Sequence, residues 1–303
     1  MNIIVRSLAV AGVLLAATAV EAPTVSAQTF CGNLRDFPRS ARVLVFGLTD
    51  DQHLVRFREC GPGNARDIGA ITGLDPDTAI VGIDFRIQDG LLYGLGDGGG
   101  IYIIDRATAV ATPVTDAALT EELDGEEFDI DFNPAANALR IVSDTGQNLR
   151  HPFAEGDTQF VTQVDADLNI PIPPPGVDPA LGITGVAYAN NDLDPNTGTT
   201  LFDISSDADQ VLLQSPPNAG VLVPTGALTV AADAPVGFDI FSVRRRGVIV
   251  ANKAFAVLDV GGAPGFYRID QLTGQTILIG DFADLAVSDI AIRLRQPPSP
   301  PSP

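Results

Sequence analysis

Three aspartates hold the same place in short motifs that recur along the chain. The motifs are residues 82–85 (GIDF), 129–132 (DIDF) and 237–240 (GFDI), and their third residues are Asp84, Asp131 and Asp239. If the repeats stand side by side in the fold, these carboxylates converge. They could then hold a cation, or pair a carboxylic acid with a carboxylate as a glycosidase does. The simpler interpretation is that each buried Asp accepts main-chain amides from the neighbouring repeat.

A second set of oxygen ligands lies in the loop at residues 190–198 (NNDLDPNTG). Asp192, Asp194 and Asn196 alternate along it, and calcium prefers such oxygen donors. The loop departs from the EF-hand pattern, because Gly198 comes one residue late and the twelfth position is Asp203 rather than Glu. Residues 165–169 (DADLN) are a shorter echo. The alternative is a hairpin loop held by Asx-turns.

Other catalytic templates do not match. The two histidines, His53 and His151, cannot form a three-histidine zinc site, and no nucleophile-elbow motif is present. We expect both on the surface. Residues 96–100 (GDGGG) lie between two expected strands and predict a hairpin turn rather than a phosphate cradle. The basic run at residues 244–246 (RRR) predicts a solvated turn whose arginines pair with nearby carboxylates.

The elements that position these residues are short strands in a quasi-repeat. The third motif positions are 84, 131, 187, 239 and 291, which are 47, 56, 52 and 52 residues apart, with alanine at 187 and 291. The first motif is followed by three further strand candidates, at residues 91–95, 101–105 and 109–114. Four strands per unit is the size of a propeller blade. The sequence therefore predicts an all-β, five-bladed β-propeller. The alternatives are a six-bladed ring with two units merged between residues 129 and 236, and, less well supported, a β-sandwich.

The two ends of the repeat region complement each other. Residues 289–294 resemble a first strand with nothing after it, whereas residues 42–47, 54–59 and 66–71 resemble strands two to four with no first strand before them. We therefore expect the C-terminal strand to join the N-terminal blade and close the ring, which removes two sheet edges.

The N-terminus has the features of an export signal. Arg6 precedes an uncharged run at residues 7–20, and residues 25–27 (VSA) fit a cleavage site. We expect a signal peptide at 1–27, an extension at 28–41, the propeller at 42–295 and a proline-rich tail at 296–303. Export to the periplasm or the exterior favours a disulfide between Cys31 and Cys60, the only cysteines.

Composition excludes several classes of protein. The formal net charge of −20 disfavours nucleic-acid binding, and the 45% hydrophobic content excludes a disordered acidic tail. No segment after residue 27 is expected to span a membrane.

Several motifs together resemble the bacterial "domain of unknown function 4394" family. They are residues 82–86, 92–97, 131–134, 143–150, 190–192, 213–218 and 237–240. The resemblance runs from about Ala41 to Leu294 and implies an exported propeller-like protein, without supplying catalytic residues. We expect a binding or scaffolding module for a small molecule, a glycan or a protein. The alternatives are a calcium-assisted hydrolase of a glycoside or an ester that uses the channel carboxylates, and a structural envelope protein.

Overall fold

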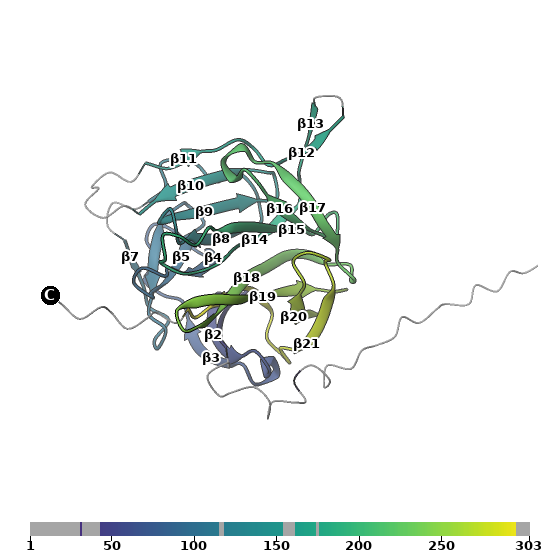
Figure 1. Ribbon diagram of the computed structural model, residues 1–303. Helices are drawn as coiled ribbons and strands as arrows, with labels where there is room; N and C mark the ends of the chain where they lie inside the picture. The colour runs from purple at the N-terminus through teal and green to yellow at the C-terminus, as the bar shows by residue number, and fades with distance from the viewer. Residues whose placement is uncertain (1–30, 32–42, 115–117, 154–160, 174–175, 295–303) are drawn as a thin grey trace, which may run out of the picture.

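The computed structural model describes residue 31 and residues 43–114, 118–153, 161–173 and 176–294 (Figure 1). The expected signal peptide, the extension apart from Cys31, and the tail lie outside the described residues. Five four-stranded antiparallel sheets form a five-bladed β-propeller. The prediction of five blades is confirmed, and the six-bladed and sandwich alternatives are wrong.

Four blades are continuous in the chain, and each runs from its inner to its outer strand. They are β4 (Ile80–Phe85), β5 (Leu92–Gly96), β6 (Ile101–Ile104) and β7 (Ala111–Pro113); β8 (Phe128–Asn133), β9 (Ala138–Ser143), β10 (Asn148–Pro152) and β11 (Gln163–Val164); β14 (Ile183–Ala189), β15 (Thr200–Ser205), β16 (Gln210–Gln214) and β17 (Leu222–Ala227); and β18 (Asp233–Arg245), β19 (Val248–Asp259), β20 (Pro264–Ile269) and β21 (Thr276–Asp281). A separate hairpin, β12 (Asn169–Ile172) and β13 (Gly176–Pro179), lies within the longest repeat spacing and projects from the ring (Figure 1).

The fifth blade is built from both ends of the described chain. Its inner strand is β22 (Val287–Ile292), followed by β1 (Leu44–Thr49), β2 (His53–Arg58) and β3 (Arg66–Ala70). β22 pairs with β1 so that Ile292 lies opposite Val45. The predicted closure of the ring is confirmed, and we call this sheet the closing blade. A short 3-10 helix, η2 (Pro62–Asn64), joins β2 to β3; another, η3 (Pro217–Ala219), joins β16 to β17.

The core lies between neighbouring blades because both faces of each sheet are covered. The β18–β21 blade, which we call the last blade, packs against the closing blade. In the last blade the Phe255 and Phe266 rings stack with centroids 5.3 Å apart, and Phe57 of the closing blade meets Phe266 edge-to-face. These rings belong to a cluster of buried apolar side chains drawn from both blades. Burial of such side chains supplies most of the favourable free energy of folding.

The disulfide between Cys31 and Cys60 is present. Cys60 lies two residues after the end of β2, so the bond ties residue 31 to the outer part of the closing blade. No helix among the described residues is long and apolar enough to cross a membrane.

Glycine permits the inner strands to approach one another closely. A Cβ atom added to Gly237 on β18 would lie 2.5 Å from the Cα of Asp289 on β22, and one added to Gly185 would lie 3.0 Å from the Cβ of Phe238. Three inner strands therefore have glycine at the first motif position, because the next inner strand occupies the space that a side chain would need.

The variant Gly237→Ala should destabilise the protein, because the obstacle is main chain and the ring must shift to admit a methyl group. We expect a loss of about 1–3 kcal/mol in the free energy of unfolding, measured by urea denaturation. Gly198→Ala is the matched control, since its added Cβ would meet nothing within 4 Å; we expect a change within about 0.5 kcal/mol. Equal stability of the two variants would contradict the close approach of β18 and β22.

Candidate functional site

The three predicted channel aspartates converge. Asp84, Asp131 and Asp239 lie at the same position on β4, β8 and β18, and each side chain is buried. Each contributes one carboxylate oxygen to a group in which all three atoms lie within 4.8 Å of one another. The central channel therefore holds three carboxyl groups close enough to share protons or to ligate one cation.

Each of these carboxyl groups also binds main chain. Asp84 accepts the amide of Phe85 at 2.6 Å and, through its other oxygen, that of Phe132 on the next inner strand at 2.7 Å. Asp239 bridges its own strand and β22 in the same way, and Asp131 accepts the amide of Tyr188 on β14. The carboxyl groups thus join one inner strand to the next, as the simpler interpretation of the sequence expects.

Two further aspartates belong to this arrangement and were not singled out from the sequence. Asp129 and Asp289 occupy the first position of their motifs, where three other motifs have glycine. Asp129 accepts the amide of Val186 at 2.7 Å, and Asp289 accepts that of Ile83 at 2.7 Å. An acidic residue in place of the usual motif glycine was the sequence signal for this second layer of bridges.

Burial raises the pKa of all five carboxyl groups. For Asp239 and Asp289 the pKa rises to about 7, mainly through desolvation, although the amide bonds act in the opposite direction. For Asp84 and Asp131 desolvation raises the pKa well above the ordinary value, and neighbouring carboxyl groups raise it further. These five carboxyl groups, which we call the carboxyl column, therefore retain protons at pH values where exposed aspartates are ionised.

One face of the propeller carries only acidic charge in its described loops. These loops join second to third strands or connect blades, and they hold 17 Asp and Glu side chains and no Lys or Arg. They are residues 50–52, 71–79, 97–100, 114, 118–127, 144–147, 165–173, 176–182, 206–209, 228–232, 260–263 and 282–286. On this face Asp144, Asp50 and Glu126 add to the effect of burial in raising the pKa of Glu127.

The proposed calcium loop is organised by its own side chains. Asp192 accepts the amide of Asp194 at 3.0 Å, and Asp194 accepts the amide of Asn196 at 2.9 Å. Asp192 is buried, whereas Asp194 and Asn196 are exposed. The loop is fixed to the β18–β19 hairpin, where Asn191 donates to the carbonyl of Ile240 at 2.8 Å. These contacts form two consecutive Asx-turns, which is the arrangement that the alternative to a calcium site expects.

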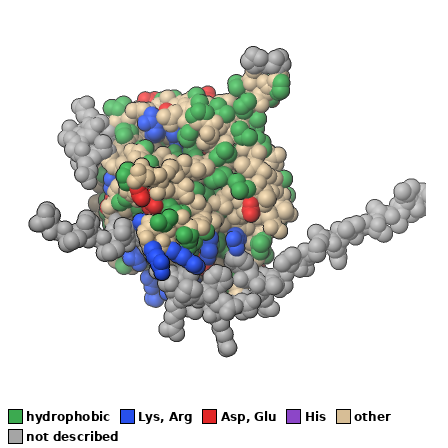
Figure 2. All heavy atoms as spheres, in the orientation of Figure 1, with side chains coloured by type: hydrophobic (Ala, Val, Ile, Leu, Met, Phe, Trp, Pro, Cys, Tyr) green, Lys and Arg blue, Asp and Glu red, His purple; other side chains and the backbone are tan. Residues whose placement is uncertain are grey.

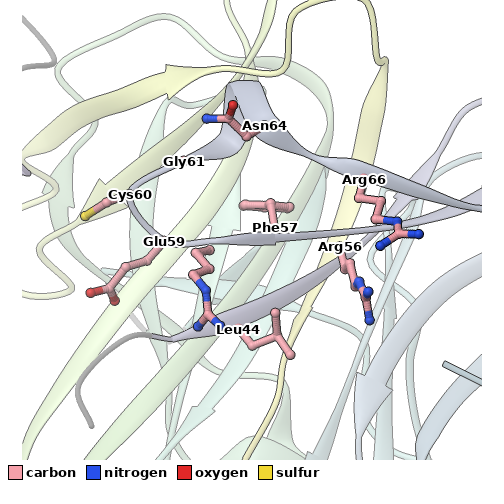
Figure 3. A pocket seen from close by; sticks show the side chains of 9 residues that line it. Leu44, Arg56, Phe57, Glu59, Cys60, Gly61, Asn64 and Arg66 are labelled. Atoms are coloured by element: carbon pink, nitrogen blue, oxygen red, sulfur yellow. The ribbon is translucent and has the colours of Figure 1, made fainter. Parts of the chain in front are cut away.

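A cavity lies on the closing blade, away from the channel. Its volume is about 580 Å³. Figure 3 shows Arg56 and Arg66 projecting to the same side of the sheet from neighbouring strands. The lining residues are Leu44, Arg56, Phe57, Arg58, Glu59, Cys60, Gly61, Asn64 and Arg66. We call this space the arginine cavity.

The arginines of the cavity are close together and exposed. Arg56 lies directly opposite Arg66 in the β2–β3 register, and Arg58 is two residues further along β2. Among the described residues, no carboxylate lies within 4.0 Å of these three guanidinium groups. Figure 2 shows Lys and Arg side chains gathered over β2 and β19 in an otherwise sparsely basic surface. The three arginines therefore concentrate positive charge that has no ion-pair partner in the described ranges of the chain.

Glu59, at one end of the cavity, faces the last blade. Its carboxylate lies 3.9 Å from the Nζ atom of Lys253 on β19. Burial raises the pKa of Glu59, while Lys253 and Arg268 act to lower it.

The expected surface position of His151 is wrong. His151 is buried on β10, its Nδ1 atom lies 3.0 Å from the Thr162 hydroxyl, and its ring packs edge-to-face on Phe153. Polar neighbours in sequence concealed the strand alternation that turns this ring inward. Desolvation lowers its pKa to about 4. His53 is partly exposed and lies 3.1 Å from Asp67.

The two predicted turns are confirmed, with one correction. Residues 97–100 join β5, which ends at Gly96, to β6, and a Cβ atom on Gly96 or Gly100 would collide with Asp77. Residues 244–246 lie at the tip of the β18–β19 hairpin. No carboxylate of the described residues lies within 4.0 Å of these arginines, although hydrogen bonds from Asn196, helped by the charge of Arg244, lower the pKa of Asp194. Arg244 also donates to the carbonyl of Gly247.

The carboxyl column predicts that the protein loses stability as pH rises from about 4 to 7. A carboxyl group whose pKa is raised in the folded state, as for Asp239 from 3.8 to about 7, binds its proton more tightly when folded. Its stabilising contribution is complete below the unfolded pKa and is lost as pH rises through the folded pKa.

This slope can be measured as the urea midpoint at several pH values. Asp239→Asn should reduce the slope while lowering stability by about 1–3 kcal/mol, because an amide nitrogen cannot accept one of the two main-chain bonds. A midpoint that rises steadily from pH 4 to 7 would contradict the assignment.

Three solved structures resemble the protein at low sequence identity. An auxiliary nutrient binding protein from Bacteroides thetaiotaomicron is 12% identical, with a TM-score of 0.41; the match covers 70% of this chain and 55% of that one. A chain of a nidogen/laminin complex is 12% identical, with a TM-score of 0.47 and coverage of 85% and 100%. A candidate 6-phosphogluconolactonase from Bacteroides uniformis is 12% identical, with a TM-score of 0.40 and coverage of 83% and 99%.

The search among curated proteins finds no match. A family model described as "Domain of unknown function (DUF4394)" matches residues 53–291, which include the inner strands of all five blades except the last residue of β22. The chain belongs to this family of domains of unknown function.

Proposed function

We propose that the protein is an exported binding module and that the arginine cavity binds an anionic ligand. The observation that carries the proposal is the cross-strand pair Arg56 and Arg66, with Arg58 beside it and no carboxylate partner among the described residues. Like charges directly opposite each other in a sheet are destabilising, and a bound anion would relieve that repulsion. The cavity volume of about 580 Å³ is in the range of small-molecule sites.

The distribution of charge along the chain supports this location. Residues 81–236 carry 24 acidic and four basic side chains, whereas the rest of the chain carries 14 of each. The whole excess of negative charge therefore lies in this part of the sequence, which includes most of the three blades between the closing blade and the last one. An anion bound at the closing blade avoids most of that repulsion, and several arginines can bind one carboxylate, sulfate or phosphate group.

The remaining lining residues suggest the rest of the ligand. Leu44 offers a partly buried apolar surface, and the exposed side chain of Asn64 offers hydrogen-bonding groups. A small organic acid or an acidic sugar combines these features. The disulfide between Cys31 and Cys60 at the edge of the cavity supports export, because such bonds persist in oxidising compartments.

Calorimetric titration with galacturonate, and with galactose as its uncharged counterpart, tests the proposal. We expect galacturonate to bind and galactose not to, and the affinity for galacturonate to fall as salt rises. Arg56→Gln with Arg66→Gln should weaken binding at least tenfold, whereas Arg246→Gln, at the hairpin tip, should not. Inorganic sulfate and phosphate should compete if the anionic group alone is recognised. Binding unaffected by the cavity substitutions, or binding of none of these anions, would refute the site.

A second candidate function is a calcium-assisted hydrolase acting through the channel, and the convergence of Asp84, Asp131 and Asp239 within 4.8 Å favours it. Calcium prefers oxygen ligands, and it would compete with the protons of the column.

Calcium added to EDTA-treated protein at pH 7.5 should then raise the melting temperature by a few degrees, because binding to the native state stabilises it. Asp131→Asn should abolish the rise if the channel binds the ion. Asp194→Asn should abolish it instead if the loop at residues 190–198 does. No shift at millimolar calcium would refute both cation sites.

A further inference from the structure

One position of the blade has an aromatic residue in four blades and an arginine in the fifth. The position lies on the second strand, opposite the third motif residue. It is Phe46 opposite Ala291, Tyr93 opposite Asp84, Phe202 opposite Ala187, and Phe255 opposite Asp239. On β9 it is Arg140, opposite Asp131. Arg140 is 1% exposed, so a charged group occupies a place that the fold otherwise fills with a ring.

The facing blade carries a second exception. This exception also lies on the second strand of a blade, at the residue that pairs with the second residue of the motif. In four blades that residue is small or apolar, namely Gly47, Gly94, Ile141 and Ala256. In the β14–β17 blade it is Asp203. Asp203 is fully buried; desolvation raises the pKa of its carboxyl group well above the ordinary value, and the positive charge of Arg140 acts in the opposite direction. Both exceptions therefore lie in the same interface, between the β8–β11 blade and the β14–β17 blade.

Arg140 is held firmly by polar groups from both blades. Its Nη1 atom donates to Asn148 at 2.6 Å and to Asp165 at 2.8 Å, and its Nη2 atom donates to Asn218 at 2.8 Å. Tyr188 also hydrogen-bonds the guanidinium group. These contacts fix Arg140 where an aromatic ring would stand, but they leave its Nε–H without an acceptor among the described residues.

Three buried acceptors in the same interface also lack a donor among the described residues. They are both carboxylate oxygens of Asp203 and the Oε1 atom of Gln214. Gln214 belongs to the network, because its Nε2 atom donates to Pro217 at 2.7 Å and approaches Asn148 at 3.4 Å. It stands one strand from Asp203, on the same face of the sheet. Buried polar atoms without partners are costly, so a ligand of matching chemistry is expected.

The combination of donors and acceptors selects the ligand. A metal cation satisfies Asp203 and Gln214 but cannot accept from Nε–H, and an anion accepts from Nε–H but cannot donate to the other two. Water donates two hydrogen bonds and accepts others, and buried water typically makes about three. We propose that ordered water binds between these two blades and joins Asp203 to Arg140 and Gln214, so that the two exceptional residues act as one unit. This inference is independent of the arginine cavity.

A crystal structure of the full chain at better than about 1.5 Å resolution tests the site directly, because buried water makes about three bonds and is well ordered. We expect density for water within hydrogen-bonding distance of Asp203 and of Arg140 Nε or Gln214 Oε1. A direct contact between Asp203 and Arg140 with no water between them, or a metal ion there, would overturn the proposal.

A double-mutant cycle in urea tests whether the residues act as a unit. Arg140→Phe and Asp203→Ala restore the residue types found in the other blades, so the double variant should be more stable than the sum of the single changes predicts. Relative to the wild type, we expect the fold increase in the unfolding equilibrium constant of the double variant to be at least ten times smaller than the product of the fold increases of the two single variants. Arg150→Ala is the control for Arg140, since Arg150 also contacts Asp165 but is partly exposed; with Asp203→Ala it should be additive. Additivity in both cycles would contradict the proposal.

Discussion

The structure depends on how the inner edge of each blade is satisfied in a closed ring. The first strand of a blade pairs with its second strand on one side only, and its other edge is buried against the neighbouring inner strand. Buried amides without acceptors are rarely tolerated. Asp84 supplies acceptors to Phe85 on its own strand and to Phe132 on the next, so one side chain satisfies two edges at once. Four of the five junctions between inner strands thus hold a carboxyl group in a place from which water is excluded, whereas among the described residues no aspartate bridges β14 to β18.

That solution limits what the channel can do chemically. A hydrolytic pair needs one protonated and one ionised carboxyl group beside an accessible substrate. The oxygens of Asp84 and Asp239 are already used as acceptors for main-chain amides. The raised pKa values follow from the same burial that makes the bridges necessary, so they are explained without catalysis. The arginines of the arginine cavity have no carboxylate partner within the described part of the chain, which is why the binding proposal rests on them.

The sequence was sufficient for the architecture and for part of the channel. Evenly spaced motifs and two complementary chain ends predicted five blades and their closure, since both depend on local pattern. Asp129 was not predicted, because the prediction of converging carboxylates rested on the third motif position, whereas Asp129 lies at the first. The sequence could not predict that Arg56 and Arg66 face each other, because this depends on the register in which β2 pairs with β3 across η2. A bulge at Leu54 and Val55 shifts that register within the strand pair. Features that depend on cross-strand register can be identified only once the pairing of the strands is known.

The inequivalence of the blades connects these features. A ring of similar sheets needs only that apolar faces meet, and Phe255 in the last blade meets that need. Where the chain departs from this pattern, at Arg140 and Asp203, the departures lie in one interface, so replacing Arg140 alone would remove the cation that lowers the pKa of the buried Asp203 carboxyl group. The closing blade departs differently, by placing positive charge at its exposed edge. The fold requires neither departure; the two proposals place ordered water at the first and an anionic ligand at the second.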